Sequence, residues 1–237
     1  TSPPDSGNKD AIIKEVECLD GLADAVNVTD GAGAKSHMSA LATAAILAQN
    51  GIEPILQFTT RDRNRIAIQG DLLGGWALDI PNILCLYGDE VKGGDQPDTK
   101  EVRDLDTIGL LKTAHEIKIK KMYPSGRKIF DAPEFFIGGA DTPFKINNNF
   151  DGSNQIKKIE AGVEFFQTQY AFDADILKNY MLKLNELSIT DKAYFIIGLG
   201  VIKSAKSARW MNKNLFGINI PEEIINRIEQ SNNETLE

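Results

Sequence analysis

Short apolar runs alternate along the chain with stretches of helical periodicity. The runs are rich in β-branched and aromatic residues and predict six strands, at 24–29, 53–59, 82–87, 134–138, 165–171 and 193–198. The first three begin at residues 24, 53 and 82, a regular spacing of 29. Helical patterns fill the gaps, among them 39–50, 101–118 and a last helix beginning at Pro221. Apolar strands that alternate with helices predict a parallel sheet covered by those helices.

The repeat length favours one architecture over its rival. Units of about 30 residues are typical of a (β/α)8 TIM barrel, a fold of about 250 residues. Six clear strands in 237 residues predict a single α/β barrel domain over 1–237 that is truncated, being incomplete at both ends. No glycine-rich dinucleotide fingerprint follows the first strand, which disfavours a doubly wound sheet. Flavodoxin-like winding is the remaining alternative.

Composition and charge narrow the class of protein. Hydrophobic residues make up 42% and charged residues 25% of the chain, as in ordinary globular proteins. The net charge of −8 argues against nucleic acid as a partner, and no apolar run approaches the roughly 18 residues that cross a membrane. Only two cysteines occur, Cys18 and Cys85, and a reduced, cytoplasmic protein is expected.

Candidate chemistry lies where the predicted strands end, because barrel sites are built on the loops that follow the strands. The polar residues there are mainly amides, hydroxyls and carboxylates. His37 and His115 are far apart in sequence, in or beside helical patterns. Neither a metal site nor a Ser-His-Asp triad is therefore expected.

Four local patterns each allow two interpretations. Asp89 follows an apolar strand and either brings a carboxylate to the barrel mouth or caps the next helix. The glycines of 92–97 either form a turn or admit a phosphate to backbone N–H groups. The arginines of 61–65 either cover the mouth or, for two of the three, form surface ion pairs with Asp62 and neighbouring acids. Residues 151, 154 and 158 have a spacing that places them on one helix face, which is either functional or simply solvated.

Several of these stretches resemble the methylenetetrahydrofolate reductase family. They are Val26-Asn-Val-Thr-Asp30, Gly51-Ile-Glu-Pro-Ile-Leu-Gln-Phe-Thr59, Arg61-Asp-Arg-Asn-Arg65, Leu86-Tyr-Gly-Asp89, Gly94-Asp-Gln-Pro97, Lys158-Ile-Glu-Ala-Gly162 and Gln167-Thr-Gln-Tyr170. The resemblance runs from Pro3 to the helix after Pro221. It implies a (β/α)8 barrel that binds FAD at the carboxyl ends of its strands and reduces methylenetetrahydrofolate to methyltetrahydrofolate.

The resemblance also implies roles for individual residues. The positions that match flavin contacts are Thr29, Gln57, Leu86, Tyr87, Gly88, Asp89, Gly139 within 137–140, Asp151, Asn154 and Lys158. The trio Asp151, Asn154 and Lys158 would hold the ribityl and phosphate groups, and Gln169 would bind the folate pterin. Asp89 is the candidate catalytic residue, because a carboxylate there would stabilise the cation that forms when the folate ring opens.

Two departures from the family pattern stand out. The family's proton donor is the Glu of a Glu-x-x-Pro-Pro strand, which Pro3-Pro4 would place one residue before Thr1, and an eighth strand is expected after Glu237. Tyr87 stands where many members carry Arg. Other functions also remain open: a pterin-binding barrel that transfers a methyl group without a redox cofactor, or an accessory folate-binding subunit. NADH, NADPH or an electron-donor subunit would reduce the flavin, and a homo-oligomer is expected.

Overall fold

The computed structural model describes residues 1–234 as an α/β fold with one parallel sheet. Its six strands follow chain order, β1-β2-β3-β4-β5-β6. They are β1 (Val26–Val28), β2 (Pro54–Thr59), β3 (Asn82–Leu86), β4 (Phe136–Asp141), β5 (Phe165–Tyr170) and β6 (Tyr194–Gly198). All six strands predicted from the sequence are confirmed, and so is the (β/α)8-barrel fold class, incomplete in this chain, since parallel strands in chain order with helices between them are the barrel's pattern.

Eight α-helices lie among residues 1–234. They are α1 (Lys9–Val16), α2 (Ala40–Gln49), α3 (Arg65–Ala77), α4 (Thr107–Lys120), α5 (Ser153–Glu160), α6 (Ala174–Glu186), α7 (Ala205–Asn214) and α8 (Glu222–Glu234). Three 3-10 turns accompany them, η1 (Glu17–Leu19), η2 (Ala32–Ala34) and η3 (Val91–Gly93). Side-chain caps fix several helix starts: the Asn64 carbonyl oxygen, for example, accepts the N–H groups of Ile66 and Ala67 at 3.0 Å. None of the helices in the described residues is long and apolar enough to span a bilayer.

The chain divides into two compact units. Unit 1 comprises Thr1–Gly139 and Lys157–Glu164, and unit 2 comprises Ala140–Ile156 and the chain from Phe165 onward. Each unit has its own buried residues.

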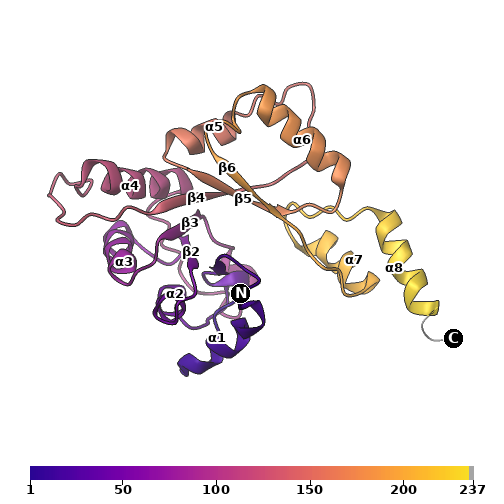
Figure 1. The fold of residues 1–237 in the computed structure, drawn as a ribbon, viewed down its shortest axis with the longest axis horizontal. Coiled ribbons are helices and arrows are strands. Elements are labelled where there is room, and N and C mark those ends of the chain that lie inside the picture. The colour runs from indigo at the N-terminus through magenta and orange to yellow at the C-terminus, as the bar shows by residue number, and fades with distance from the viewer. Residues whose placement is uncertain (235–237) are drawn as a thin grey trace. The chain divides into compact units, whose positions relative to one another are not determined.

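The core of unit 1 lies on one face of its strands. Parallel register pairs Val28 with Leu56 and Phe58 with Cys85, and all four side chains are buried. Helices α2, α3 and α4 follow one another along one side of these strands (Figure 1). Because side chains alternate along a strand, the residues between the buried ones point to the opposite face. That second face carries polar residues, of which Gln57 is one, and it is the face on which a site can form.

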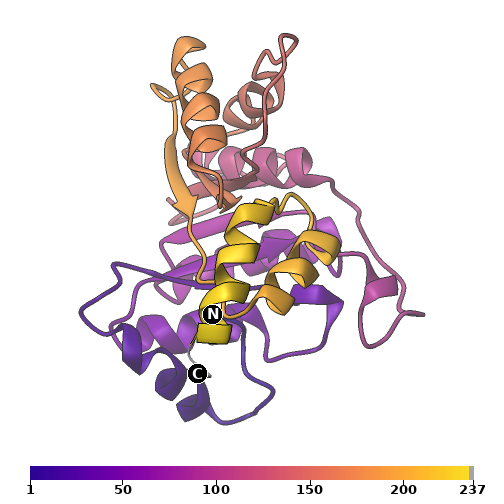
Figure 2. The same ribbon diagram turned by 90° about the vertical axis from the view of Figure 1, so that its right-hand side faces the viewer.

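Apolar side chains of unit 2 pack between its strands and between its last helices. Rings of Phe166 on β5 and Phe195 on β6 stack with centroids 5.0 Å apart. Helices α7 and α8 lie side by side (Figures 1 and 2), and they bury a small cluster that includes Ala208 and Ile225. The β5–β6 register shifts between Gln167 and Tyr170, as at a β-bulge, and a bulge re-aims the side chains near the strand end.

Candidate functional site

In unit 1 the polar face of the sheet presents side chains without protein partners. The buried hydroxyl of Thr29, just after β1, has no hydrogen-bond partner among residues 1–234. The Gln57 side chain on β2 is half-buried and lies beside Leu84 in the register. A buried polar atom without a partner is uncommon in native proteins, and a ligand is one explanation for it. Thr29 thus places an unpartnered hydroxyl just after β1, and Gln57 places a half-buried amide on β2.

The loops after β1 and β2 are joined by a buried carboxylate. Asp30 accepts both the backbone N–H and the hydroxyl of Thr59 at 2.9 Å, and Arg63 donates to it at 2.6 Å. Arg63 also pairs with Asp71 at 3.0 Å. The side chains of Asp30 and Arg63 are only 8% and 16% exposed, so this ion pair is largely removed from water. Asp30 is thus a structural residue that fixes where the two strands end.

The three arginines of 61–65 serve different purposes. Arg61 is buried and makes a bidentate pair with Asp62, at 2.8 and 2.7 Å, and it donates to the carbonyl of Gly31. Arg63 is the buried partner just described, whereas Arg65 forms an exposed pair with Asp104. The interpretation as surface ion pairs therefore holds for Arg65, while Arg61 and Arg63 hold the loops together.

The loop at residues 87–89, after β3, is held through its backbone by Arg103. This guanidinium donates to the Tyr87 carbonyl at 2.9 Å and lies over the Tyr87 ring, 3.8 Å from the centroid. Glu101 pairs with Arg103, and the hydrogen bond lowers the pKa of Glu101 to about 2. Gly88 has φ of +86°, and a Cβ there would lie 3.2 Å from the Thr59 Cβ. The turn therefore requires glycine at position 88. The side chain of the neighbouring Tyr87 is about half exposed, at 49%.

Asp89 projects an exposed carboxylate from the same loop. Its Oδ2 accepts the backbone N–H of Gly33 at 2.7 Å. That N–H belongs to η2, in the loop after β1, so Asp89 does not cap the helix that follows it in sequence. The helix-cap interpretation is wrong for this residue, because η3 has no side-chain cap and the next α-helix, α4, begins at Thr107 and is capped by Asp106. Asp89 instead places a negative charge at the carboxyl ends of the strands.

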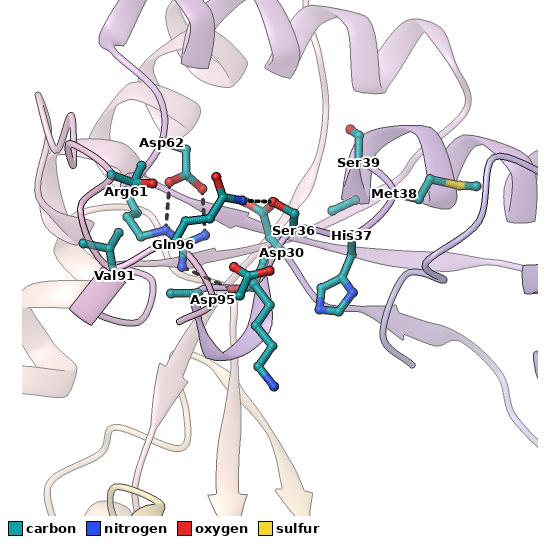
Figure 3. A pocket seen from close by; sticks show the side chains of 15 residues that line it. Asp30, Ser36, His37, Met38, Ser39, Arg61, Asp62, Val91, Asp95 and Gln96 are labelled. Carbon is teal, nitrogen blue, oxygen red and sulfur yellow. Dashed lines mark hydrogen bonds and ion pairs between the residues drawn. The ribbon is translucent and has the colours of Figure 1, made fainter. Parts of the chain in front are cut away.

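A polar cavity of about 230 Å³, which we call the loop pocket, opens between the loops after β1, β2 and β3. Figure 3 shows the Arg61–Asp62 pair and the hydrogen bond from Gln96 to Ser36 at one side of it, and His37 at the other. Gly94 lies against the backbone of this pocket, since a Cβ there would overlap the carbonyl oxygen of Ala34. The glycine at 94 is therefore needed for contact between two loops.

The remaining unit 1 candidates lie inside secondary structure. Leu86 ends β3 beside Thr59 in the register, and Gly139 is buried in β4 opposite Cys85. Lys158 is half-buried on α5.

In unit 2 the placement of Asp151 corrects the sequence-based prediction. Helix α5 begins at Ser153, so Asp151 lies before the helix and accepts the Ser153 N–H at 2.9 Å. Gly152 between them has φ of +69°, a left-handed conformation that cannot belong to the helix. The single helix face predicted for 151, 154 and 158 is therefore wrong for Asp151. Asn154 and Lys158, four residues apart on α5, do share a face.

Gln169 lies on β5 with both ends of its side-chain amide engaged. The nitrogen donates to the carbonyl of Phe216 at 3.0 Å, and the oxygen accepts the N–H of Tyr170 at 3.0 Å. These two contacts fix the orientation of the amide and leave one N–H donor and one lone pair of its oxygen for a ligand.

A buried polar trio in unit 2 was not found from the sequence. Tyr180 of α6 donates to Asp141 at 2.8 Å, and Gln155 of α5 donates to Asp141 and Tyr180, each at 2.8 Å. The Gln155 side-chain oxygen is buried without a partner in residues 1–234. Burial and the neighbouring Asp141 carboxylate raise the pKa of the Tyr180 hydroxyl. The trio joins the end of β4 to α5 and α6, but no local spacing links its three residues.

Fold and site together define a class: a barrel-type α/β protein with polar and acidic groups on the loops at the carboxyl ends of its strands. The sequence profile of the methylenetetrahydrofolate reductase family matches residues 2–237. The chain belongs to that family, as the resemblance predicted.

Two solved structures are similar to the chain. An uncharacterized protein from Clostridium thermocellum that binds two copies of 5-methyl-5,6,7,8-tetrahydrofolic acid superimposes with a TM-score of 0.64 at 18% identity, over 97% of this chain and 73% of that one. A long-chain alkane monooxygenase gives a TM-score of 0.45 at 14% identity, over 87% of this chain and 60% of that one, too low for an argument. A comparison with curated proteins gave no match. At these identities the structures support the fold alone.

Proposed function

We propose that the chain is the barrel of an FAD-dependent reductase that converts 5,10-methylenetetrahydrofolate to 5-methyltetrahydrofolate. The observation that carries the proposal is membership of the methylenetetrahydrofolate reductase family over nearly the whole chain. The folate ligand of the Clostridium thermocellum protein supports the substrate class. We further propose that the protein acts in the cytoplasm as a homo-oligomer, and that NADH, NADPH or an electron-donor subunit reduces the cofactor.

The residues of unit 1 fit the edge of a flavin. The unpartnered Thr29 hydroxyl and the Gln57 amide offer the hydrogen bonds that a heterocyclic ring needs, and the half-exposed Tyr87 offers an aromatic surface. Gly88 allows the turn that packs against Thr59 and Arg61, and Leu86 with Gly88 and Gly139 would complete the contact. The family resemblance, rather than the geometry of unit 1, assigns the ribityl and phosphate groups to Asp151, before α5, and to Asn154 and Lys158 on α5. When bound, the cofactor supplies the hydride.

Asp89 has the position and the support that a stabilising carboxylate needs. Its exposed carboxylate is oriented by the Gly33 N–H, and its backbone carbonyl accepts hydrogen bonds from Arg61 and Arg103, at 3.3 and 3.4 Å. A fixed negative charge of this kind stabilises a cation without reorganising during the reaction. Asp89 would therefore stabilise the cationic substrate, while Gln169 would bind the pterin through the N–H and the lone pair that its two backbone contacts leave open.

The test is an anaerobic visible absorption spectrum of the protein with FAD, followed by NADH or NADPH and then the folate substrate. A flavin that binds, bleaches with the nicotinamide and regains its colour with the folate supports the reductase. If only a chemical reductant bleaches it, the donor is a partner subunit. Absence of saturable FAD binding would contradict the proposal, and folate binding without flavin would favour the methyl-transfer or accessory barrel.

Two variants sharpen this test. Thr29→Val removes the unpartnered hydroxyl and should weaken FAD about fivefold, since one hydrogen bond contributes roughly 1 kcal/mol. The control is Thr190→Val, which removes a hydroxyl that donates a hydrogen bond to Asn185 in unit 2 and should leave FAD affinity unchanged. Asp89→Asn should lower kcat about 100-fold when measured at saturating FAD, and Asp98→Asn, an exposed acid in the same loop, should leave kcat unchanged.

A further inference from the structure

A short hairpin at residues 121–130, which we call the basic hairpin, lies between α4 and the segment that leads into β4. An antiparallel bridge pairs Met122 with Lys128, and the Gly126 N–H closes the turn at the tip by donating to the Tyr123 carbonyl at 2.8 Å. Two further backbone hydrogen bonds of 2.9 Å join its two arms. Because these bonds already fix its backbone, a partner would not have to order the hairpin.

The basic hairpin concentrates positive charge in a chain whose net charge is −8. Lys121, Arg127 and Lys128 are exposed, and no acidic residue occurs between 121 and 130. None of these three cations has a carboxylate within ion-pair distance in the described part of the chain. Arg127 instead lies over the ring of Tyr123, 4.2 Å from its centroid. Three positive charges are therefore available to an acidic partner.

An exposed aromatic ring ends the basic hairpin. Phe130 is 88% exposed, and the residue before it, Ile129, is buried. Lys128 is exposed again, so exposure alternates here as on a strand with one face toward solvent. Aromatic residues and arginine are enriched in protein–protein interfaces, and a fully buried aromatic anchor often dominates the binding energy. Phe130 has the exposure and the neighbours that such an anchor needs.

Unit 1 also contains a cavity of the opposite charge, which we call the acidic pocket. It has a volume of about 340 Å³ and lies among the end of α1, the segment before β1 and the turn between α2 and β2. Ile13, Val16 and Ile52 contribute apolar wall. Four exposed acids line the pocket, and no Lys or Arg does: Glu17, Asp20, Asp24 and Glu53. None of the four is in an ion pair within the described residues, so their charge is not neutralised by this chain.

The basic hairpin and the acidic pocket lie at the same end of the sheet. The hairpin comes before β4, and the segments that form the pocket come before β1 and β2. Because these strands are parallel, all of these segments lie at the amino ends of the strands, whereas Asp89 lies at the carboxyl ends. Two complementary surfaces at one end of a molecule can meet reciprocally about a two-fold axis, the commonest symmetry of homo-oligomers.

We propose that a second copy of this chain docks at this end, with Phe130 of each copy in the acidic pocket of the other and the cations of each hairpin facing the acids. A cavity of about 150 Å³ holds benzene in another protein, so about 340 Å³ accommodates one phenyl ring. The complementary surface is present on the chain itself, and a net charge of −8 would repel an anionic membrane. The inference assigns a surface to the homo-oligomer proposed above and does not depend on flavin or folate binding.

Sedimentation equilibrium of the whole chain measures the association. A dimer should form at low salt, and high salt should weaken it at least about tenfold, because salt screens the charges across the interface. Phe130→Ser should weaken the dimer about tenfold, since it removes the anchoring ring. Phe216→Ser is the matched control: Phe216 is also 88% exposed but lies in unit 2, and its variant should leave the dimer unchanged. A chain that stays monomeric at low salt at every concentration measured would overturn the proposal.

Exchange of charge between the two surfaces locates the interface. The double variant Lys121→Glu and Lys128→Glu makes the hairpin acidic and should be monomeric, and Glu17→Lys with Asp20→Lys in the pocket should be monomeric as well. A mixture of the two variants should dimerise, because both reciprocal contacts then join opposite charges. All four residues are exposed, so these changes should not disturb folding. Two variants that stay monomeric when mixed would contradict the reciprocal contact.

The matched control for charge is Lys92→Glu with Lys100→Glu. It makes the same change in net charge on exposed residues after β3, at the other end of the strands, and should leave the dimer intact. An equal loss of dimer in this control would show that net charge, rather than the basic hairpin, governs association, and the proposal would be wrong. It would also be wrong if the chain stayed monomeric and bound vesicles of anionic lipid through Phe130, because the partner would then be a membrane.

Discussion

The guanidinium of Arg103 lies over the ring of Tyr87, 3.8 Å from its centroid, and donates to the carbonyl of the same residue at 2.9 Å. One side chain thus fixes both the backbone and the ring of Tyr87. The guanidinium is only 12% exposed, so water competes little for these contacts. Arg103 supplies, from 16 residues further along the chain, a positive charge beside Tyr87.

Arg103→Met should loosen the 87–89 loop and weaken FAD binding about tenfold, because it removes the stacking and three carbonyl hydrogen bonds. The measurement is a fluorescence titration of FAD. Arg127→Met is a matched control: Arg127 lies over Tyr123 at 4.2 Å, in the same unit, away from the strand ends. Equal losses in both variants would show that general destabilisation explains the effect.

Asp30→Asn should destabilise the protein by about 3 kcal/mol, because it leaves the buried Arg63 guanidinium with Asp71 as its remaining acidic partner. Urea denaturation followed by circular dichroism measures this. Asp104→Asn, which breaks the exposed pair with Arg65, should leave the midpoint unchanged. Equal shifts of the urea midpoint in the two variants would mean that burial does not determine how much each ion pair contributes to stability.

Tyr180→Phe should cost about 1–3 kcal/mol, because it takes a hydrogen bond from the buried Asp141 carboxylate. It should also change the pH dependence of stability. Burial raises the pKa of the Tyr180 hydroxyl above its unfolded value near 10, so the hydroxyl stays protonated to a higher pH in the folded state than in the unfolded state. The wild type should therefore lose stability as pH rises above about 10, and thermal melts at pH 9 to 11 should show a shallower loss in Tyr180→Phe.

The two thiols should react at very different rates. Cys18 is exposed, whereas Cys85 is fully buried in β3 and burial raises its pKa to about 12. At pH 8 a thiol-specific chromogenic reagent should modify one thiol of the native protein quickly, and the second only after unfolding in denaturant. The Cys18→Ser variant should then show almost no fast reaction. Rapid modification of Cys85 in the native state would indicate that unit 1 opens readily.

Sequence patterns predicted the strands well because each strand is a short apolar run between helical stretches. The run 53–59, for example, becomes β2 with a shift of one residue at its start. Spacing failed at Asp151, since three-residue and four-residue intervals imply a common face only within a helix, and Gly152 keeps Asp151 outside α5. The spacing of residues also gave no sign that Arg103 holds the 87–89 loop, because a contact with a loop 16 residues earlier produces no periodic pattern in the sequence.

In the candidate site, too, the sequence identified individual residues but not the residues that contact them. Asp89 was identified as a residue at a strand end, but its partner, the Gly33 N–H, is 56 residues away. The trio of Asp141, Gln155 and Tyr180 comes from three elements and spans 39 positions, so only the tertiary structure joins it. Residue type and position in the sequence were enough to propose Asp89 as a site residue. The hydrogen-bond partners could be identified only from the structure.

The contact between Gly94 and Ala34 couples the lengths of two loops. The loops after β1 and β3 meet backbone to backbone at this point, with no room for a side chain at position 94. An insertion or deletion in one loop would separate them unless the other loop changed to match. Relatives that differ in length after the first of these strands should therefore also differ after the third, and a graft of one loop between relatives should succeed only when both are exchanged.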